Sequence, residues 1–329
     1  MNLAITQEAT RLYTALQHTG WSQDDCDVIA PLTEEINRRK KEQNAIILAH
    51  SYQTPDIMYG IADVIGDSYS LSKIASQHPA KKIIFCSVYF MGETAKILSP
   101  EKDVLVPARA GCSLAESITA KDVRQLKTQY PDRPVICYIN TTAEVKAQSD
   151  VCCTSSNALK VIHSFPDEEI IFIPDKLMGQ NLQKETKKKL ILWNGTCVVH
   201  ERFDEARIRD IRTQFPNAKL LAHTECSPGV VSVVDMAGST GQMLDFVAHT
   251  DTTDFVLITE CGITDRIKTE FPNKNIVGTC NLCPYMKSIM MKDVLTALTN
   301  PRADQIVTIP DDILKKAKQS LERMMEIGV

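Results

Sequence analysis

The chain of 329 residues lacks the features that mark several classes of protein. No stretch approaches the roughly eighteen apolar residues of a membrane-spanning helix, and the start of the chain has no apolar core typical of a signal peptide. Neither sign of charge dominates, because 37 basic and 41 acidic residues leave a net charge of -4. We therefore expect a cytoplasmic protein that binds neither a membrane nor a nucleic acid.

The composition is that of an ordinary folded protein, with 43% hydrophobic and 24% charged residues, 13 Gly and 15 Pro. At roughly 150 residues per domain, the length alone predicts about two domains. The 11 cysteines are odd in number, and the chain is too long for a small disulfide-linked scaffold. In a reducing compartment we expect them to be buried small residues or metal ligands.

Short apolar runs rich in Ile, Val and Leu alternate with segments of helical periodicity. The expected strands are 45–49, 82–86, 104–106, 135–139, 169–173, 190–193, 219–222, 255–258 and 275–277. The expected helices include 71–76, 123–130, 206–215 and 313–325. Continuous apolar strands that alternate with helices are typical of parallel sheets covered on both faces, so the sequence predicts an α/β fold.

The chain also matches itself at a shift near 86 residues, at polar as well as apolar positions. Three expected strands end at equivalent residues spaced by 88 and 85, namely His50, Tyr138 and His223. Further along each copy, an aspartate and then a hydroxyl residue recur: Asp63, Asp150 and Asp235, then Ser68, Ser155 and Thr240. The period exceeds that of a solenoid repeat, so we interpret it as three copies of a small domain.

This triplication replaces the two-domain count. We expect a helical N-terminal extension at 1–44, with Trp21 covering the core, and a C-terminal helix at 302–329. Between them we expect three similar αβα three-layer domains with small parallel sheets, at 45–130, 131–215 and 216–301. Functional groups of parallel α/β units collect beyond the carboxyl ends of the strands. The three domains are therefore expected to surround a pseudo-threefold axis, with the active site at the centre.

One cysteine recurs in each copy, at spacings of 85 and 86: Cys112, Cys197 and Cys283. Three thiolates at a common point would leave a vacant metal position for substrate, whereas structural zinc and electron-transfer clusters normally take four protein ligands. The alternative is three unrelated buried thiols that share a loop position. Cys280 forms a C-x-x-C with Cys283 and is either a spare thiol or a fourth ligand. Six other cysteines in or beside expected strands are expected to be buried small residues: Cys86, Cys137, Cys152, Cys153, Cys226 and Cys261. Cys26 has no interpretable context.

The recurring hydroxyls Ser68, Ser155 and Thr240 lie between strand-like and helical runs, where helix N-caps are found. They cap helices and do nothing more, or they also present helix N-termini to a phosphate or carboxylate. His50, His200 and His223 lie on the same expected loops. Glu225 beside His223 offers a general base, and tyrosine hydroxyls could donate to a developing oxyanion.

Together these residues resemble the quinolinate synthase family, the A protein of bacterial de novo NAD biosynthesis. The resemblance runs from about Ala45 to the C-terminus. It rests on Ile47-Leu48-Ala49-His50 with Tyr52-Gln53, Ala62-Asp63 with Gly66-Asp67-Ser68, Tyr138-Ile139-Asn140, Cys153-Thr154-Ser155, Gly195 with Cys197 and His200, His223 with Glu225-Cys226, Gly238-Ser239-Thr240-Gly241-Gln242-Met243, and Cys283 with Met286-Lys287.

The resemblance implies a [4Fe-4S] cluster held by Cys112, Cys197 and Cys283, whose open iron acts as a Lewis acid. It implies condensation of iminoaspartate with dihydroxyacetone phosphate to quinolinate, with loss of phosphate and two waters. The implied acid–base residues are Glu225, Tyr52, Tyr138 and His223. The implied substrate-binding residues are His50, Ser68, Tyr138, Ile139, Asn140, Ser155, His200, His223, Thr224, Glu225, Ser239 and Thr240. An aspartate-oxidising enzyme is the implied source of the imine.

One departure concerns the segment before Cys283. Many family members carry C-x-x-C-x-x-C there, but in this chain Val277 takes the place of the first cysteine of that motif. Two other functions fit the same pattern: a [4Fe-4S] hydro-lyase that acts on a small polycarboxylate, and a non-catalytic iron–sulfur protein in which Cys280 is a fourth ligand.

Overall fold

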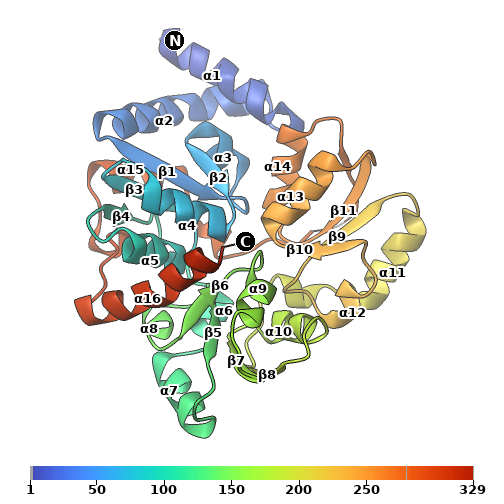
Figure 1. Cartoon of the computed structure of the whole chain (residues 1–329). Coiled ribbons are helices and arrows are strands. Elements are labelled where there is room, and N and C mark those ends of the chain that lie inside the picture. The colour runs from blue at the N-terminus through green and yellow to red at the C-terminus, as the bar shows by residue number, and fades with distance from the viewer. Residues whose placement is uncertain (1–2, 279, 329) are drawn as a thin grey trace. The chain divides into compact units, whose positions relative to one another are not determined.

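The computed structural model describes residues 3–278 and 280–328. In Figure 1 the chain builds three small sheets one after another, blue to cyan, green, and yellow to orange. Each sheet has four strands, and the strand pairs with a described register are parallel. The structure therefore confirms the predicted fold class of three similar αβα domains.

The three sheets share one strand order. The first sheet runs β2 (Val64–Gly66), β1 (Ala45–His50), β3 (Lys82–Cys86), β4 (Asp103–Leu105). The second runs β6 (Val151–Cys153), β5 (Val135–Tyr138), β7 (Glu169–Ile173), β8 (Lys189–Leu192). The third runs β10 (Met236–Gly238), β9 (Lys219–His223), β11 (Asp254–Ile258), β12 (Asn275–Ile276).

This order places the loops after β1, β5 and β9 where a parallel sheet normally binds its ligand. In each sheet the first strand lies between the second and the third. The strand order therefore reverses at the first strand, since the second strand is added on one side of it and the third on the other. Ligands of open α/β sheets bind outside the carboxyl ends of the strands at such a switch point. His50, Tyr138 and His223 are the last residues of these three strands.

Helices follow most strands, as a parallel sheet requires. In chain order they are α1 (Leu3–Leu16), α2 (Gln23–Glu42), α3 (Pro55–Gly60), α4 (Ser68–Gln77), α5 (Tyr89–Leu98), α6 (Ser113–Glu116), α7 (Ala120–Gln129), α8 (Ala143–Lys146), α9 (Ala158–His163), α10 (Lys176–Gln183), α11 (Glu205–Gln214), α12 (Pro228–Val231), α13 (Thr240–His249), α14 (Gly262–Glu270), α15 (Met291–Thr299) and α16 (Asp311–Ile327). Short 3-10 turns lie at η1 (Gln17–Thr19), η2 (His200–Arg202), η3 (Met286–Ser288) and η4 (Ala303–Gln305).

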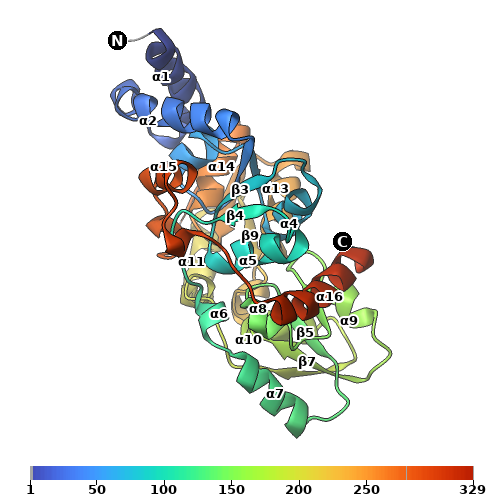
Figure 2. The ribbon, with the colours of Figure 1, turned by 90° about the vertical axis from the view of Figure 1, so that its left-hand side faces the viewer.

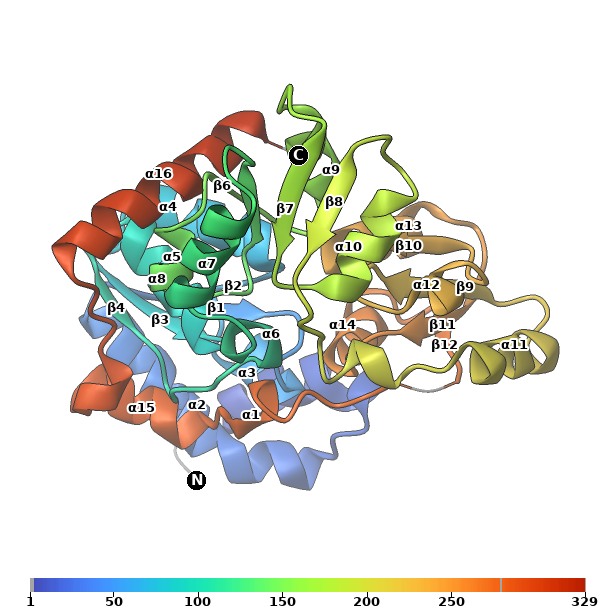
Figure 3. The same cartoon turned by 90° about the horizontal axis from the view of Figure 1, so that it is seen from below.

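The helices at the two ends of the chain pack in different places. Helices α1 and α2 form a pair whose core is Ala9, Leu12, Leu16, Cys26 and Ala30, and the partly buried Trp21 packs against it. Helix α15 lies beside α2 (Figure 3). Helix α16 instead lies along strand β6 of the second sheet and the neighbouring helices α8 and α9 (Figure 2). In the described residues, no helix combines the length and apolar character that crossing a bilayer would need.

Contacts between Cα atoms divide the described chain into two compact units. The first consists of residues 3–110, 260–276 and 282–307 and contains the first sheet. The second consists of residues 111–259, 277–278, 280–281 and 308–328 and contains the second sheet with β9, β10 and β11. The predicted boundaries of the three domains stay a prediction.

Candidate functional site

In the second unit, the loops after β5 and β9 meet through a buried carboxylate. The Tyr138 hydroxyl donates to Glu225 Oε1 at 2.5 Å, and the Asn140 amide lies 3.5 Å from the same oxygen. His200 Nδ1 lies 2.8 Å from the other oxygen, Oε2. Residues predicted from three separate stretches of sequence therefore share one hydrogen-bonded group.

Two histidines flank this carboxylate, and their orientation is set by further hydrogen bonds. The backbone N–H of Glu225 donates to His223 Nδ1 at 3.2 Å, so Nε2 is the His223 nitrogen placed to donate a hydrogen bond. His200 Nε2 lies 2.9 Å from the Thr259 hydroxyl. The two imidazole rings stack with centroids 4.7 Å apart and an interplanar angle of 20°. A proton can thus be held at defined atoms next to Glu225.

The surroundings of Glu225 keep it ionised. Burial by itself would raise the pKa of this carboxyl group. Electrostatic attraction to His223 and His200, together with hydrogen bonds from His200 and Tyr138, outweighs burial and holds the pKa well below its usual range. Glu225 is therefore a buried anion that accepts hydrogen bonds at both oxygens.

The cysteines separate into two groups by exposure. Among the free cysteines of the described chain, only Cys112, Cys197 and Cys283 are partly exposed; Cys26, Cys86, Cys137, Cys152, Cys153 and Cys226 are buried. The predicted burial of Cys86, Cys137, Cys152, Cys153 and Cys226 is confirmed. The three partly exposed thiols are those that recur once per copy.

Each of these three thiols lies at the start of a short helical turn. The carbonyl oxygens of Cys112, Cys197 and Cys283 accept the backbone N–H four residues further on, from Glu116, Glu201 and Lys287 respectively. Burial raises the pKa of Cys197, and the charges of Glu225 and Cys112 act in the same direction. The backbone N–H groups of His200 and Val199 oppose this by bonding to the sulfur. Burial prevails, so the pKa of Cys197 is raised overall, and burial likewise raises the pKa of Cys283.

The loops that carry Cys112 and Cys197 are joined by one serine. The Ser113 hydroxyl donates to the carbonyl oxygen of Thr196 at 3.0 Å and accepts the N–H of Val198 at 3.1 Å. These are the residues on either side of Cys197. The second unit therefore fixes the two cysteine loops against each other.

The first unit contains the remaining predicted residues His50, Tyr52, Ser68 and Cys283. The N–H of Tyr52 donates to His50 Nδ1 at 3.1 Å, as that of Glu225 does to His223 in the third copy. The His50 and Tyr52 rings meet edge to face with centroids 4.6 Å apart. Ser68 Oγ lies 3.8 Å from the sulfur of Met91.

The predicted N-caps are displaced by one residue. Ser68 and Thr240 are the first residues of α4 and α13, and the caps are Asp67 and Ser239, each in a reciprocal capping box. In the second copy, Ser155 lies in a turn before α9, whose N-cap is Asn157. The N–H of Thr154 donates to the Asn157 side-chain oxygen at 2.8 Å. The prediction was wrong because an N-cap residue has extended backbone, so Asp67 and Ser239 were assigned to the preceding strand segments.

The hydroxyls at these helix starts lie close together in the second unit. Ser156 Oγ donates to Ser239 Oγ at 2.9 Å, and both Ser239 and Thr240 are buried. Ile139 is also buried and donates its N–H to the carbonyl oxygen of Cys153. The backbone of Ile139 thus extends the pairing between β5 and β6 by one hydrogen bond.

Several buried polar atoms have no hydrogen-bond partner within the described part of the chain, among them Asn140 Oδ1, Asp175 Oδ2, Thr224 Oγ1 and, in α10, Asn181 Oδ1. Asn140, Asp175 and Thr224 each follow a strand, β5, β7 and β9 respectively. Buried polar groups are nearly always paired in proteins, so such a group of atoms fits a polar ligand or ordered water.

Three further findings differ from the sequence analysis. Neither Cys261 nor Cys280 is a free thiol, because both are disulfide-bonded, so Cys261 is not a buried small residue of the expected kind and Cys280 is neither a spare thiol nor a fourth ligand in this structure. Thr259 bonds to the predicted site residue His200, and Ser113 bonds to both chain neighbours of Cys197, although neither residue was singled out from the sequence. Asn181 also escaped notice, although its amide donates to the carbonyl oxygens of Thr224 and Cys226 at 2.9 and 2.8 Å.

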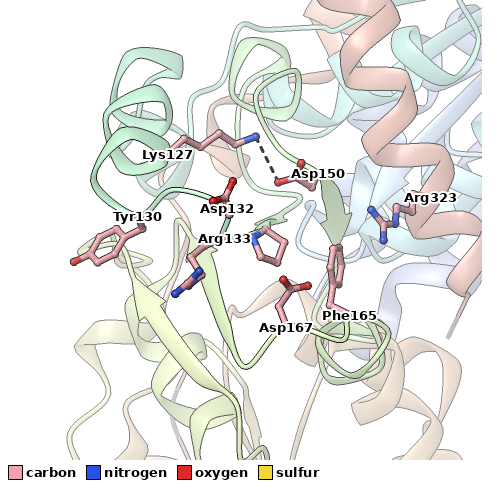
Figure 4. Close-up of a pocket in the computed structure, with 9 residues that line it drawn as sticks. Lys127, Tyr130, Asp132, Arg133, Asp150, Phe165, Asp167 and Arg323 are labelled. Carbon is pink, nitrogen blue, oxygen red and sulfur yellow. Dashed lines mark ion pairs between the residues drawn. The ribbon is translucent and has the colours of Figure 1, made fainter.

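A surface cavity of about 370 Å³ lies elsewhere in the second unit (Figure 4). Pro134 and Asp150, which line it, directly precede β5 and β6, so the cavity is at the amino ends of these strands. Its lining mixes carboxylates with cations, and Lys127 pairs with Asp150 at 3.4 Å. The cavity is therefore remote from the strand ends that carry Tyr138 and Glu225.

Comparisons with known proteins agree on one family. The family model described as "Quinolinate synthetase A protein" matches residues 34–326. A protein of Caulobacter vibrioides named "Quinolinate synthase" is 44% identical over 305 residues, covering 91% of this chain and 83% of its own. "Quinolinate synthase 1" of Mesorhizobium japonicum is 47% identical over 293 residues, covering 89% and 90%. "Quinolinate synthase" of Xylella fastidiosa is 45% identical over 295 residues, covering 89% and 86%.

Proposed function

Since the chain belongs to the quinolinate synthetase A protein family, we propose that it condenses iminoaspartate with dihydroxyacetone phosphate to give quinolinate, one phosphate and two waters. The observation that carries this proposal is the buried group of Tyr138, His200 and Glu225 beside the free thiol of Cys197. The imine is unstable, so we propose that an aspartate-oxidising enzyme supplies it.

The proposed chemistry needs protons to be taken from carbon and delivered to leaving hydroxyl groups. Glu225 is a buried, ionised carboxylate and is suited to act as the general base. The Tyr138 hydroxyl donates to it and can return a proton, and His223 presents Nε2 as a donor because Nδ1 is already occupied. Tyr52 is proposed as a further acid–base group from the first unit.

The substrates carry carboxylates and a phosphate, which the second unit can bind at the start of α13. The N-terminus of this helix has a buried serine cap and a buried threonine as its first residue, Ser239 and Thr240, with the Ser156 hydroxyl bonded to the cap. Helix N-termini favour anions through their free N–H groups and dipole. We propose Ser155, Asn140, Thr224, Ile139 and His200 as further binding residues there, and His50 and Ser68 in the first unit.

We further propose that Cys112, Cys197 and Cys283 hold a [4Fe-4S] cluster. Their shared setting supports this, since they are the partly exposed free thiols of the described chain and each lies at the start of a short helical turn. The unpaired atoms of Asn140, Asp175 and Thr224 fit a site that takes a polar ligand. When bound through three thiolates, such a cluster leaves one iron able to act as a Lewis acid toward a substrate carboxylate or hydroxyl.

A single metal ion is the competing arrangement. Cys197, His200 and Glu225 place one sulfur, one nitrogen and one oxygen within 4.8 Å of one another. However, both nitrogens of His200 and both oxygens of Glu225 already take part in hydrogen bonds, to Thr259, Tyr138 and each other. These residues are therefore better suited to acid–base work beside the thiolate than to metal ligation.

The test is metal and acid-labile sulfide content of anaerobically purified protein, followed by a quinolinate assay with iminoaspartate and dihydroxyacetone phosphate. We expect about four iron and four sulfide per chain and formation of quinolinate with one phosphate released. Protein that contains zinc and no sulfide would refute the cluster. A cluster-loaded sample that makes no quinolinate would instead refute the proposed reaction.

A further inference from the structure

An ion pair in the first unit, formed by a buried carboxylate and a partly exposed lysine, lies between two loops that carry predicted site residues. Glu260 is fully buried, and its carboxylate lies 3.2 Å from the ammonium group of Lys287. Glu260 directly precedes Cys261 and α14, and Lys287 lies in η3, four residues after Cys283. Neither residue has a role in the proposed acid–base chemistry.

The carboxylate of Glu260 holds the backbone of the cysteine loop. Its Oε1 accepts the N–H of Cys283 at 3.1 Å, and its Oε2 accepts the N–H of Gly262 at 2.5 Å. Hydrogen bonds to a charged acceptor are stronger than those between neutral groups. The position of Cys283 along its turn is therefore fixed from inside the unit.

The ammonium group of Lys287 holds the tyrosine loop in turn. It donates to the carbonyl oxygen of Tyr52 at 2.7 Å and lies 3.4 Å from that of Gln53. Gly262 packs against the same stretch, because a Cβ placed there would lie 2.7 Å from the backbone of Tyr52. The Gln53 amide also reaches the carbonyl oxygen of Met286 at 3.3 Å. Two loops more than two hundred residues apart in sequence are thus joined at several points.

We infer that Glu260 and Lys287 are positioning residues that hold the Cys283 thiolate and the Tyr52 ring in a fixed relation for the reaction. An ion pair with a buried carboxylate is a weak source of stability, because the lost hydration of that carboxylate offsets much of the attraction. The pair is better explained by the geometry it imposes. This inference rests on the proposed function, in which Cys283 is a cluster ligand and Tyr52 an acid–base group.

The test compares Glu260→Gln, Lys287→Met and Lys287→Arg with the control Glu322→Gln, in full-length cluster-loaded protein. Glu322 lies on α16 with a side chain 52% exposed and pairs with Lys318 at 3.7 Å. Outer partners of metal ligands typically affect metal affinity by about tenfold or more, so Glu260→Gln and Lys287→Met should release iron to a chelator about tenfold faster than the control. Their kcat should fall by about tenfold or more with little change in KM, because misplaced groups affect the chemical step.

The double variant should lose little more than either single variant, because the pair acts as a unit. Lys287→Arg should recover most of the kcat, since it keeps the charge. Folded variants whose iron release and kcat match those of Glu322→Gln would overturn the inference, even if their melting temperature were lower. If Glu260→Gln does not fold, the two substitutions of the partly exposed Lys287 decide the question by the same criteria.

A readout without a cluster separates this inference from the proposed function. In metal-free protein, alkylation of Cys283 by iodoacetamide, measured by mass spectrometry against Cys112 as internal reference, should be faster in Glu260→Gln and Lys287→Met than in Glu322→Gln. Equal rates would overturn the positioning role. Wild-type protein that binds no cluster and makes no quinolinate would refute the proposed function and leave this comparison to decide the positioning role alone.

Discussion

The carboxylate of Asp235 accepts the backbone N–H of Leu220 at 2.8 Å, while the N–H of Asp235 donates to the carbonyl oxygen of the same residue at 2.9 Å. The same two bonds join Asp63 to Ile47 and Asp150 to Val135. In each sheet the recurring aspartate therefore binds the loop that leads into the second strand to the backbone of the first strand. It lies before that strand and not beyond a carboxyl end, where functional groups of parallel α/β units collect, so its role is structural.

Replacing this aspartate should lower stability without affecting the reaction. Asp235→Ala removes the bond to Leu220 and the ion pair with Arg212, whose atoms lie 2.7 Å apart. Because the site is only partly buried, we expect the free energy of unfolding to fall by about 1 kcal/mol. Urea denaturation measures this change. Asp245→Ala is the control, because the Asp245 side chain is 76% exposed.

The loss should depend on pH in a defined direction. The pKa of Asp235 is lowered in the folded protein: burial acts to raise it, but hydrogen bonds from Leu220 and Arg212 and the charge of Arg212 prevail. A lowered folded pKa contributes stability above the unfolded pKa of about 3.9, and this contribution is lost as the pH falls through the folded value. The difference between wild type and Asp235→Ala should thus shrink below about pH 4. A difference that grew on acidification would contradict the assignment.

The three partly exposed cysteines should differ from the others in cluster retention. Cys112→Ser, Cys197→Ser and Cys283→Ser should each lose most of the bound iron and sulfide, because serine is a poor substitute for a thiolate ligand. Cys26→Ala, at a buried position between α1 and α2, should keep both. Iron and sulfide analysis of anaerobic samples is the measurement.

Cys280→Ser is the informative companion, since Cys280 is disulfide-bonded in the structure. It should retain the cluster. Loss of iron on this substitution would identify a fourth ligand and exclude an open iron for substrate.

Strand prediction succeeded where a strand is long and buried. The central strands β1, β5 and β9 and the strands β3, β7 and β11 are almost entirely buried, and their continuous apolar runs predicted them to within one residue at most ends. The strands β2, β6 and β10 were missed in all three copies. Each has only three residues and lies directly beside a capping motif, so its sequence looks like a loop and only pairing with the first strand makes it extended.

The site could be predicted in part for a related reason. Residues such as Tyr138, His223 and Glu225 follow central strands, and their position along the chain predicts that they meet at a sheet edge. Thr259, Ser113 and Glu260 act through segments folded against them from elsewhere in the chain. Their hydroxyl or carboxyl groups carry no local pattern, so only the packed structure shows what they bind.

Thr259 gives a graded test of the acid–base group. Thr259→Val removes the hydroxyl 2.9 Å from His200 Nε2 but keeps the side-chain shape, so it should loosen the orientation of His200. The loss of one hydrogen bond predicts a fall in kcat of about tenfold. Glu225→Gln removes the proposed base and should lower kcat by about a hundredfold or more. Quinolinate formation by cluster-loaded protein measures both.

Thr296→Val on the surface of α15 is the matched control, since its hydroxyl bonds within the helix to the carbonyl oxygen of Lys292. It should retain wild-type turnover. If Thr259→Val were as damaging as Glu225→Gln, the threonine itself would have to act on the substrate. If Glu225→Gln kept wild-type turnover, another residue would have to be the base.

Ser113 joins the Cys112 loop to the Cys197 loop in the second unit, so we expect it to hold the two loops at a fixed distance. Its hydroxyl accepts from Val198 and donates to Thr196, so Ser113→Ala removes both bonds and leaves two backbone groups beside Cys197 without this partner. The loops should then separate more easily, and iron should leave for a chelator about tenfold faster. Ser113→Thr keeps the hydroxyl and should restore slow release. Ser232→Ala is the control, because that exposed hydroxyl bonds only to the nearby carbonyl oxygen of Gly229. Equal release rates in Ser113→Ala and Ser232→Ala would show that the cysteine loops hold their spacing without this serine.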